Sequence, residues 1–256
     1  TLYFAENEIR MFPDKVILEL FNFIPSKKSY ALSSRILLNV DGSINEISIH
    51  KSIIKPTYRL SYEDVDEIID LNIIDESSLI KLYKLMIERK EWRVKQGALI
   101  IDESKGRIYT DVKKPILKII DPTKSRFLVS ESMILFNTSL AKFCLNNSIP
   151  IIFRSQFISD LPSDINNIDN QILRNYKLKG ILRSGINSLK AYKHYSLGLE
   201  EYTQASAPIR RYIDFINHRQ VKSYLDRNIA YTYNEVENIL INITPKLRES
   251  ISRQRD

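Results

Sequence analysis

The stretch from Tyr202 to Arg219, which reads YTQASAPIRRYIDFINHR, constrains this chain more than any other part of the sequence. Ser206 is a favourable N-cap residue because its hydroxyl can accept a hydrogen bond from a backbone N–H of the first helical turn. Pro208 is tolerated in that turn because its missing N–H would have no partner inside the helix. These residues predict a helix that begins near Ala207 and continues to about Leu225.

Two adjacent arginines, Arg210 and Arg211, would then lie in the first turn of this helix. That position is unfavourable for cations because the helix dipole places partial positive charge at the N-terminus. Free backbone N–H groups and two guanidinium groups at one point are suited to bind an anion, and phosphate fits them best. The alternative is that both arginines are solvated or paired with an acid such as Asp214, one turn further on.

The rest of the chain alternates between patterns typical of strands and of helices, which predicts one α+β domain. Asp41-Gly42-Ser43 indicates a hairpin turn between two β-rich runs, and the runs 97–102 and 107–112 read as a second hairpin. The predicted strands are 31–40, 44–54, 97–102, 107–112, 115–120 and 150–153, and the predicted helices are 61–71, 77–91, 125–146, a helix through Tyr176, 207–225 and 232 to the C-terminus.

Composition narrows the class of protein only moderately. The 256 residues are 43% hydrophobic and 27% charged, which is typical of a globular chain, and no apolar run appears long enough to span a membrane. A single cysteine, Cys144, excludes an intrachain disulfide and favours a reducing compartment. The formal net charge of +7 is consistent with a polyanionic partner.

Local motifs of the common enzyme classes are missing from the sequence. The three histidines have no metal-ligand spacing, and His218 follows Asp214 by one turn, which favours a surface pair over a catalytic role. The chain has no GxSxG nucleophile motif, no Walker loop and no GxGxxG. A serine hydrolase, a P-loop nucleotidase and a dinucleotide-binding enzyme are therefore not supported.

The order of residues in 202–219 resembles the signature of the ribonuclease II (RNB) family of exoribonucleases. Four other blocks resemble the same family and occur in its order: RLSYEDV at 59–65, LVSESMIL at 128–135, IPIIFRSQ at 149–156 and LGL at 197–199. The segments YRLSYEDVDEI and EWRVKQGA are most similar to the cyanobacterial and plastid branch.

The resemblance implies an RNB-type catalytic domain over residues 1–256, with a mixed, largely antiparallel sheet flanked by helices. It also implies an N-terminally truncated domain, because the family's metal-binding aspartates lie upstream of the strand that begins TLYF. No Asp-x-x-Asp-Asp run occurs in the sequence, and cold-shock-like and S1 domains are not part of it.

The resemblance assigns roles to five residues. Arg210 matches the family arginine that contacts the phosphate at the scissile region, and Arg211 the neighbour that holds RNA backbone or a structural partner. Tyr62 matches a tyrosine near the 3′-terminal nucleotides, for which the alternative is a core position. Glu131 matches an acid that contacts the last ribose, and Ser206 matches part of a Thr-Ser pair before Pro-Ile-Arg.

Three departures from the family pattern bear on these roles. Ser130 stands where many relatives have a second acid, and Ala207 replaces one hydroxyl of the Thr-Ser pair. Ile100 or Ile101 stands where some relatives stack an aromatic ring on the terminal bases. Because stacking contributes about 1–3 kcal/mol per base, this change predicts a weaker hold on short products.

The activity implied is 3′→5′ hydrolysis of single-stranded RNA to nucleoside 5′-monophosphates, with magnesium ions held by upstream aspartates. The alternatives are a catalytically inactive RNB-like protein that binds RNA and, from charge alone, a basic protein–protein module. We expect a monomer that does not enter a membrane and works in the cytoplasm or the plastid stroma.

Overall fold

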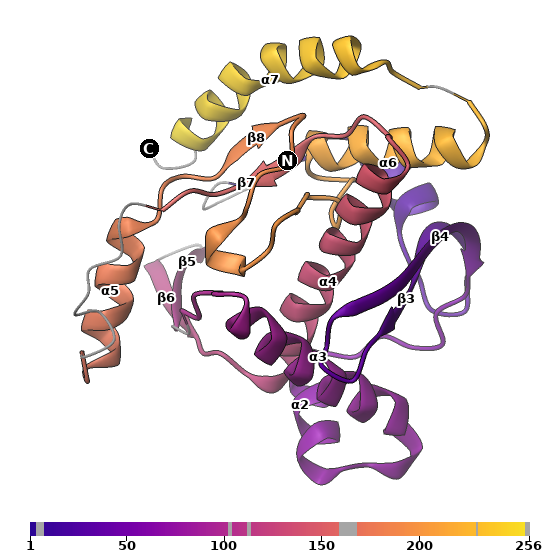
Figure 1. The fold of residues 1–256 in the computed structure, drawn as a ribbon. Coiled ribbons are helices and arrows are strands. Elements are labelled where there is room, and N and C mark those ends of the chain that lie inside the picture. The colour runs from indigo at the N-terminus through magenta and orange to yellow at the C-terminus, as the bar shows by residue number, and fades with distance from the viewer. Residues whose placement is uncertain (4–7, 102–103, 112–113, 159–167, 229, 254–256) are drawn as a thin grey trace.

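The computed structural model describes residues 1–3, 8–101, 104–111, 114–158, 168–228 and 230–253 (Figure 1). Its mixture of helices and antiparallel strands confirms the predicted α+β class. The strands are β1 (Leu2–Tyr3), β2 (Glu8–Ile9), β3 (Ser29–Leu38), β4 (Ile44–Ile54), β5 (Lys105–Asp111), β6 (Lys114–Ile120), β7 (Phe153–Ser155) and β8 (Ile186–Ser188). The helices are α1 (Asp14–Val16), α2 (Tyr62–Leu71), α3 (Ser77–Lys95), α4 (Lys124–Asn146), α5 (Gln171–Ile181), α6 (Tyr212–Leu225) and α7 (Tyr233–Arg253), with short helical turns η1 (Ile17–Phe21), η2 (Ile74–Glu76) and η4 (Tyr195–Leu197).

The strands in the described part of the chain form separate two-stranded antiparallel pairs, β1–β2, β3–β4, β5–β6 and β7–β8, and not one continuous sheet. The longest pair, β3–β4, confirms the first predicted hairpin. Its turn needs Gly42, which has a φ of +82° and lies so close to α3 that an added Cβ would be 2.7 Å from the Glu88 carbonyl oxygen.

The second predicted hairpin was wrong in its pairing, because β5 pairs with β6 and residues 97–101 form no strand. Gly97 has a φ of +89° and ends α3, while the Ala98 N–H donates to the Arg93 carbonyl oxygen at 2.9 Å. This left-handed ending is typical of a glycine that follows a helix. The chain therefore uses this glycine to leave α3, and the residues after it lead to β5.

The predicted starts of α2 and α4 are confirmed by side-chain caps. Ser61 and Asp64 form a reciprocal capping box at α2, with N–H to oxygen distances of 3.0 and 2.7 Å. Thr123 caps α4 by accepting from the Arg126 N–H. The sequence therefore carried enough local information to define both starts.

Helix α4 runs through the middle of the fold and packs against α2, α3 and the β3–β4 hairpin (Figure 1). Its residues Leu140, Ala141 and Cys144 are fully buried in a core that also contains Ile151 and Val221. Burial raises the pKa of the Cys144 thiol, so this side chain is a structural thiol and a poor nucleophile.

Length and composition alone would allow α4 to cross a membrane, contrary to the expectation that no apolar run was long enough. Half of its apolar window is buried inside the protein, however. The buried part includes the polar residues Asn137, Thr138 and Ser139, which would be costly in lipid. These observations fit a core helix.

The segment that enters β7 joins two parts of the core. Ile151 faces the cluster around α4, whereas Ile152 faces a second cluster with Ile213 and Ile216 of α6 and Val236 of α7. Both isoleucines are fully buried, and regular strand pairing begins only at Phe153, later than predicted.

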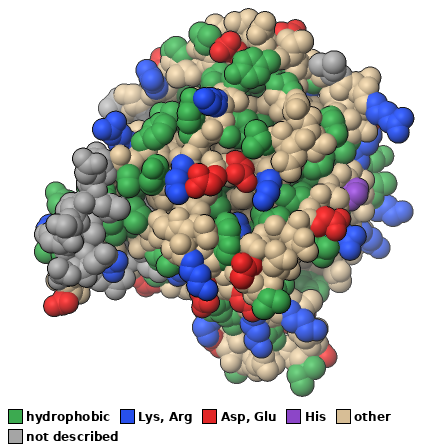
Figure 2. Space-filling view, viewed as in Figure 1, with side chains coloured by type: hydrophobic (Ala, Val, Ile, Leu, Met, Phe, Trp, Pro, Cys, Tyr) green, Lys and Arg blue, Asp and Glu red, His purple; other side chains and the backbone are tan. Residues whose placement is uncertain are grey.

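The charged surface does not by itself indicate a binding site, because the basic side chains are scattered over the face shown in Figure 2.

Candidate functional site

Helix α6 begins at Tyr212, so the predicted helix start near Ala207 was wrong. Residues 207–210 form a turn in which the Arg210 and Arg211 N–H groups donate to the Ala207 carbonyl oxygen at 3.1 and 3.0 Å. Arg211 then takes an extended conformation, with φ −120° and ψ 120°, and separates this turn from α6. Residues 202–211 thus form a loop, here called the signature loop, and the helix-dipole argument does not apply to Arg210.

Asp214, in the first turn of α6, holds the end of the signature loop. Its side chain is fully buried, and Oδ2 accepts a hydrogen bond from the Ala207 N–H at 2.8 Å and forms an ion pair with Arg211 Nη2 at 2.8 Å. A carboxylate is favourable here because it lies at the positive end of the helix dipole. Burial raises the pKa of Asp214, and the neighbouring Arg211 guanidinium opposes that shift. The Ala207 N–H is therefore occupied by Asp214 and is not free for a phosphate.

Arg211 is held inside the loop. Besides the ion pair with Asp214, its Nη2 donates to Ser206 Oγ at 2.9 Å, and 28% of its side chain is exposed. Ser206 therefore does not cap α6, as had been predicted, but orients Arg211. The structure thus shows the alternative for Arg211, which is a structural partner. Because Asp214 and Ser206 engage its guanidinium, the contact of Arg211 with RNA stays a prediction.

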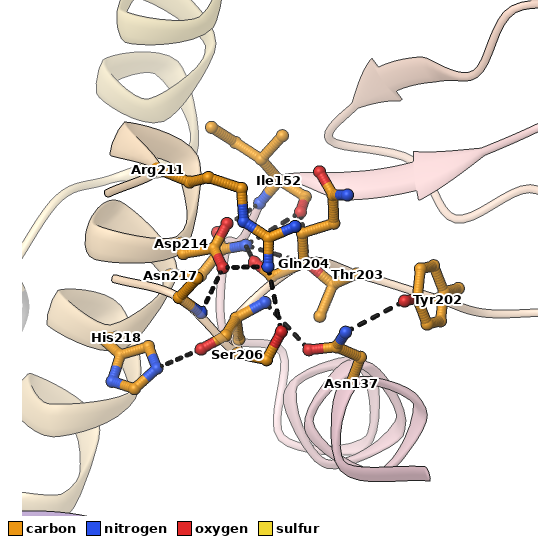
Figure 3. Close-up of polar contacts among 12 residues, drawn as sticks. Asn137, Ile152, Tyr202, Thr203, Gln204, Ser206, Arg211, Asp214, Asn217 and His218 are labelled. Carbon is orange, nitrogen blue, oxygen red and sulfur yellow. Dashed lines mark hydrogen bonds and ion pairs between the residues drawn. The ribbon is translucent and has the colours of Figure 1, made fainter. Parts of the chain in front are cut away.

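Asn217, one turn after Asp214, ties the signature loop to the strand segment before β7 (Figure 3). Its Oδ1 accepts from the Ile152 N–H at 2.9 Å. Its Nδ2 donates to the Ile152 carbonyl oxygen, to Thr203 Oγ1 and to the Gln204 carbonyl oxygen at 3.0, 2.9 and 3.2 Å. One buried amide thus joins α6, the strand segment and the loop.

Two further polar side chains fix the centre of the loop (Figure 3). Asn137 of α4 accepts from the Ala205 N–H at 3.0 Å and donates to the Tyr202 hydroxyl at 2.9 Å. His218 Nε2 lies 2.6 Å from the Ala205 carbonyl oxygen, so its partner is the loop backbone and not Asp214, as the one-turn spacing had suggested. Burial lowers the pKa of His218, which favours the neutral ring.

Arg210 is the exposed cation of this loop. Its guanidinium makes no hydrogen bond or ion pair with another side chain in the described part of the chain. Its backbone, by contrast, is fixed by the turn to Ala207 and by the anchors on either side. The loop therefore presents one unpaired arginine at a defined position, which is what an anion-binding site requires.

Glu131 lies in the core and not on an accessible surface, and its contact with a ribose stays a prediction. Its two carboxylate oxygens accept from Nε and Nη2 of Arg93 at 2.7 and 2.6 Å, and 2% of the Glu131 residue is exposed. Contact with a ribose would require this buried ion pair to open. In this arrangement the Glu131 carboxylate holds the Arg93 guanidinium in place.

Arg93 also contacts the residues that precede the signature loop. Its Nη1 donates to the Leu197 carbonyl oxygen at 2.9 Å. The next residue, Gly198, has a φ of +64°, and an added Cβ would lie 2.6 Å from the Arg93 carbonyl oxygen. A glycine is needed here because the turn combines a left-handed conformation with close contact to α3.

Tyr62, at the first position of α2, is 40% exposed and is not a core residue. The guanidinium of Arg126 lies 4.2 Å from the centre of its ring, an arrangement that combines an aromatic surface with a positive charge. Ile100 and Ile101 are half-buried. The geometry leaves Tyr62 accessible to a ligand, and its contact with RNA stays a prediction.

Over the described ranges, no group of three or more His, Cys, Asp or Glu side chains could hold a metal ion. The buried carboxylates of Glu131 and Asp214 are each paired with an arginine. The described residues therefore do not fit a magnesium site, and no chemical step through a metal is assigned to them.

Comparison with known proteins agrees with the order of the sequence blocks. The family model described as RNB domain matches residues 1–227. The chain belongs to the RNB domain family. An uncharacterized ribonuclease from Synechocystis sp. is 33% identical over all of the chain, and ribonuclease II, chloroplastic/mitochondrial, from Arabidopsis thaliana is 30% identical over 94% of it. The predicted similarity to the cyanobacterial and plastid branch is thus confirmed.

The RNB chain also matches solved structures in fold. Mycoplasma genitalium RNase R in complex with ribose methylated single-stranded RNA matches with a TM-score of 0.82 and 21% identity over 99% of the chain and 46% of that protein. Yeast Ssd1, described as a pseudonuclease, matches with a TM-score of 0.70 and 20% identity over 94% of the chain and 34% of that protein. The chain spans 39% of the length of the Synechocystis relative and 32% of the length of the Arabidopsis relative.

The sequence interpretation missed the residues that build the loop, because it concentrated on charged groups. Asn137 shares one face of α4 with Leu140, Ala141 and Cys144, at spacings of three, four and seven residues. A polar residue on an otherwise apolar helix face indicates a buried hydrogen-bonding role. Asn217 carries the same signal, because it lies between Ile213, Ile216 and Val221 in α6.

Proposed function

We propose that this RNB chain is part of an exoribonuclease, and that its signature loop binds the backbone phosphate of single-stranded RNA through Arg210. The complete protein would hydrolyse RNA from the 3′ end and release nucleoside 5′-monophosphates. The observation that carries the proposal is the contrast between an anchored loop and an unpaired Arg210 guanidinium at its surface. A donor fixed before the ligand arrives stabilises developing negative charge without the cost of reorganisation.

The anchors of the loop support this role. Asn137, Asp214, Asn217 and His218 hold it from α4 and α6, and their bonds reach the loop backbone just before the exposed Ile209 and Arg210. Buried polar groups that are satisfied in this way resist rearrangement, because leaving any of them unpaired costs about 1–3 kcal/mol. Arg210 therefore keeps its position when RNA binds.

The proposed activity includes magnesium, which residues outside the described part of the chain would bind. We infer that carboxylates elsewhere in the complete protein hold it, where it would supply activated water and stabilise the leaving oxygen. Contacts to the 2′-hydroxyl would distinguish RNA from DNA. The proposed assembly is a monomer, and the proposed compartment is the cytoplasm or the plastid stroma.

The test is digestion of 5′-labelled single-stranded RNA by the complete protein with magnesium, followed on a sequencing gel. We expect a ladder that shortens from the 3′ end and disappears with a chelator. Arg210→Ala should lower turnover by about 100-fold or more, the size of effect seen when one preorganised donor is removed. The matched control is Arg248→Ala, which removes another exposed positive charge, from α7. Equal turnover of the two variants would remove the phosphate role of Arg210.

A second candidate function is RNA binding without cleavage. The observation that favours it is the fold similarity to a protein described as a pseudonuclease. In the same digestion, RNA that stays intact but is retarded on a native gel would select this function. Arg210→Ala would then weaken the gel shift, whereas Arg248→Ala would not.

A further inference from the structure

Arg154, in the middle of β7, lies at the base of the signature loop. Its backbone N–H donates to the Tyr202 carbonyl oxygen at 2.8 Å, and the preceding residue, Phe153, forms an isolated antiparallel bridge with Thr203. On its other edge, β7 pairs with β8, where Arg154 is directly opposite Asn187. The side chain of Arg154 is thus carried by the strand to which the loop is attached.

The guanidinium of Arg154 rests in a space that a glycine leaves open. A Cβ added at Gly185 would lie 2.7 Å from both Nε and Nη2 of Arg154. The third nitrogen of the guanidinium, Nη1, donates to Asn187 Oδ1 at 3.2 Å. The group is therefore oriented by one neutral side chain and one backbone surface, and the half-buried residue keeps a route to solvent.

No acid in the described part of the chain pairs with Arg154. Burial lowers the pKa of its guanidinium, the Tyr202 phenol partly offsets this, and the Arg211 guanidinium lowers it further. A cation that is partly removed from water and lies within electrostatic range of a second cation is unfavourable without an anion. This contrasts with Arg93 and Arg211, which both have carboxylate partners.

We propose that Arg154, set against Gly185 and oriented by Asn187, is a second phosphate subsite beside the signature loop. It would bind a backbone phosphate of the same RNA strand that Arg210 contacts. The inference rests on the proposed RNA-binding function and adds a binding residue that makes no contact with the reacting atoms. An arginine suits this place because its planar fork can donate two parallel hydrogen bonds to a phosphate while a third N–H stays with Asn187.

The experiment measures the affinity of the complete protein for a fluorescein-labelled single-stranded oligouridylate by anisotropy over a series of KCl concentrations. For a single strand, each phosphate contact contributes about 0.7 to the slope of log K against log[salt]. We expect Arg154→Gln to weaken binding and to reduce the slope by about 0.7, with the Arg248→Gln control unchanged. An unchanged slope would overturn the subsite, whether or not the variant is less stable.

Arg154→Lys keeps the proposal testable if Arg154→Gln fails to fold. The lysine retains the charge but loses the planar fork, so we expect a normal slope with affinity reduced by about 10- to 150-fold, in line with the loss of one charged hydrogen bond. Unchanged affinity of Arg154→Lys would contradict the subsite. If the unmodified protein does not bind RNA, both the proposed function and the subsite fail. If it binds and Arg210→Ala weakens binding while both Arg154 variants do not, only the subsite fails.

Discussion

Replacing Asn217 by alanine should cause a large loss of stability from a single small change. The side chain is fully buried and makes four hydrogen bonds, to both backbone groups of Ile152, to Thr203 Oγ1 and to the Gln204 carbonyl oxygen. Alanine removes all four. The Ile152 carbonyl oxygen keeps a partner, because Thr203 Oγ1 donates to it at 2.6 Å. The Ile152 N–H keeps none among the described residues and is fully buried.

The expected loss in the free energy of unfolding has two contributions, the lost hydrogen bonds and the Ile152 N–H that is left without an acceptor. Three of the four bonds join groups that stay satisfied or reach water, and each such loss costs about 1 kcal/mol net. The orphaned Ile152 N–H adds about 1–3 kcal/mol for a buried donor without an acceptor. Together they predict a loss of about 4–6 kcal/mol in the free energy of unfolding, before any cavity term. Such a loss is in the range that marks a broken buried network.

Urea unfolding, followed by the fluorescence of Trp92, the single tryptophan of the chain, measures this loss. The matched control is Asn242→Ala in α7, an exposed asparagine in a helix interior, which should be neutral or slightly stabilising because alanine has the higher helix propensity. A loss below about 1 kcal/mol for Asn217→Ala would refute the reasoning. It would mean that the loop, α6 and the strand segment are joined mainly by apolar packing.

Three further predictions follow from other parts of the structure. Glu131→Gln should lower the free energy of unfolding by about 3–5 kcal/mol, because it leaves the buried Arg93 without a counter-charge, whereas Glu131→Leu combined with Arg93→Met should lose much less in the same urea assay. Burial, reinforced by nearby arginines, lowers the pKa of His194 from 6.5 to about 4, so the unfolded chain binds the proton first and stability should fall by up to about 3 kcal/mol as the pH drops from 6.5 to 4. Unfolding curves at several pH values should show this fall flattened by His194→Gln and not by a change at the exposed His50; equal curves for both would contradict the assignment. Tyr62→Ala in the complete protein should change the length of the final RNA product on a sequencing gel, and an identical ladder would make Tyr62 a structural residue only.

Local rules worked where one segment contains all the partners of an interaction. Ser61 and Asp64 are three residues apart, so their capping box could be predicted from the sequence. The β3–β4 hairpin was predictable for the same reason, because its turn is set by Asn39 to Ser43. The predicted start of α6 near Ala207 was wrong because residues 207–210 form a separate turn and Arg211 is extended, with the Ala207 N–H held by Asp214 from beyond the turn.

Charge was the weakest guide, because the sequence does not say which ions are paired. Arg210 and Arg211 are adjacent and chemically identical, yet one is exposed and the other is bound to Asp214 and Ser206. Glu131 and Arg93 are 38 residues apart and meet only because α3 packs on α4. The sequence therefore could not show that the Glu131 carboxylate is paired with Arg93 inside the core.

The sequence by itself determined the family, the α+β class, the helices α2, α3 and α4, and the importance of residues 202–219. These depend on residue order and short-range periodicity, which the chain carries at every point. Only the tertiary structure decided which polar residues would hold the signature loop. Asn137, Ile152 and Asn217 lie up to 80 residues apart. Asn217 bonds to Ile152, and Asn137 bonds to the signature loop, only after α4, β7 and α6 have packed together. The unpaired state of Arg210 was decided in the same way, since a cation is free for a ligand only when the fold brings no acid to it.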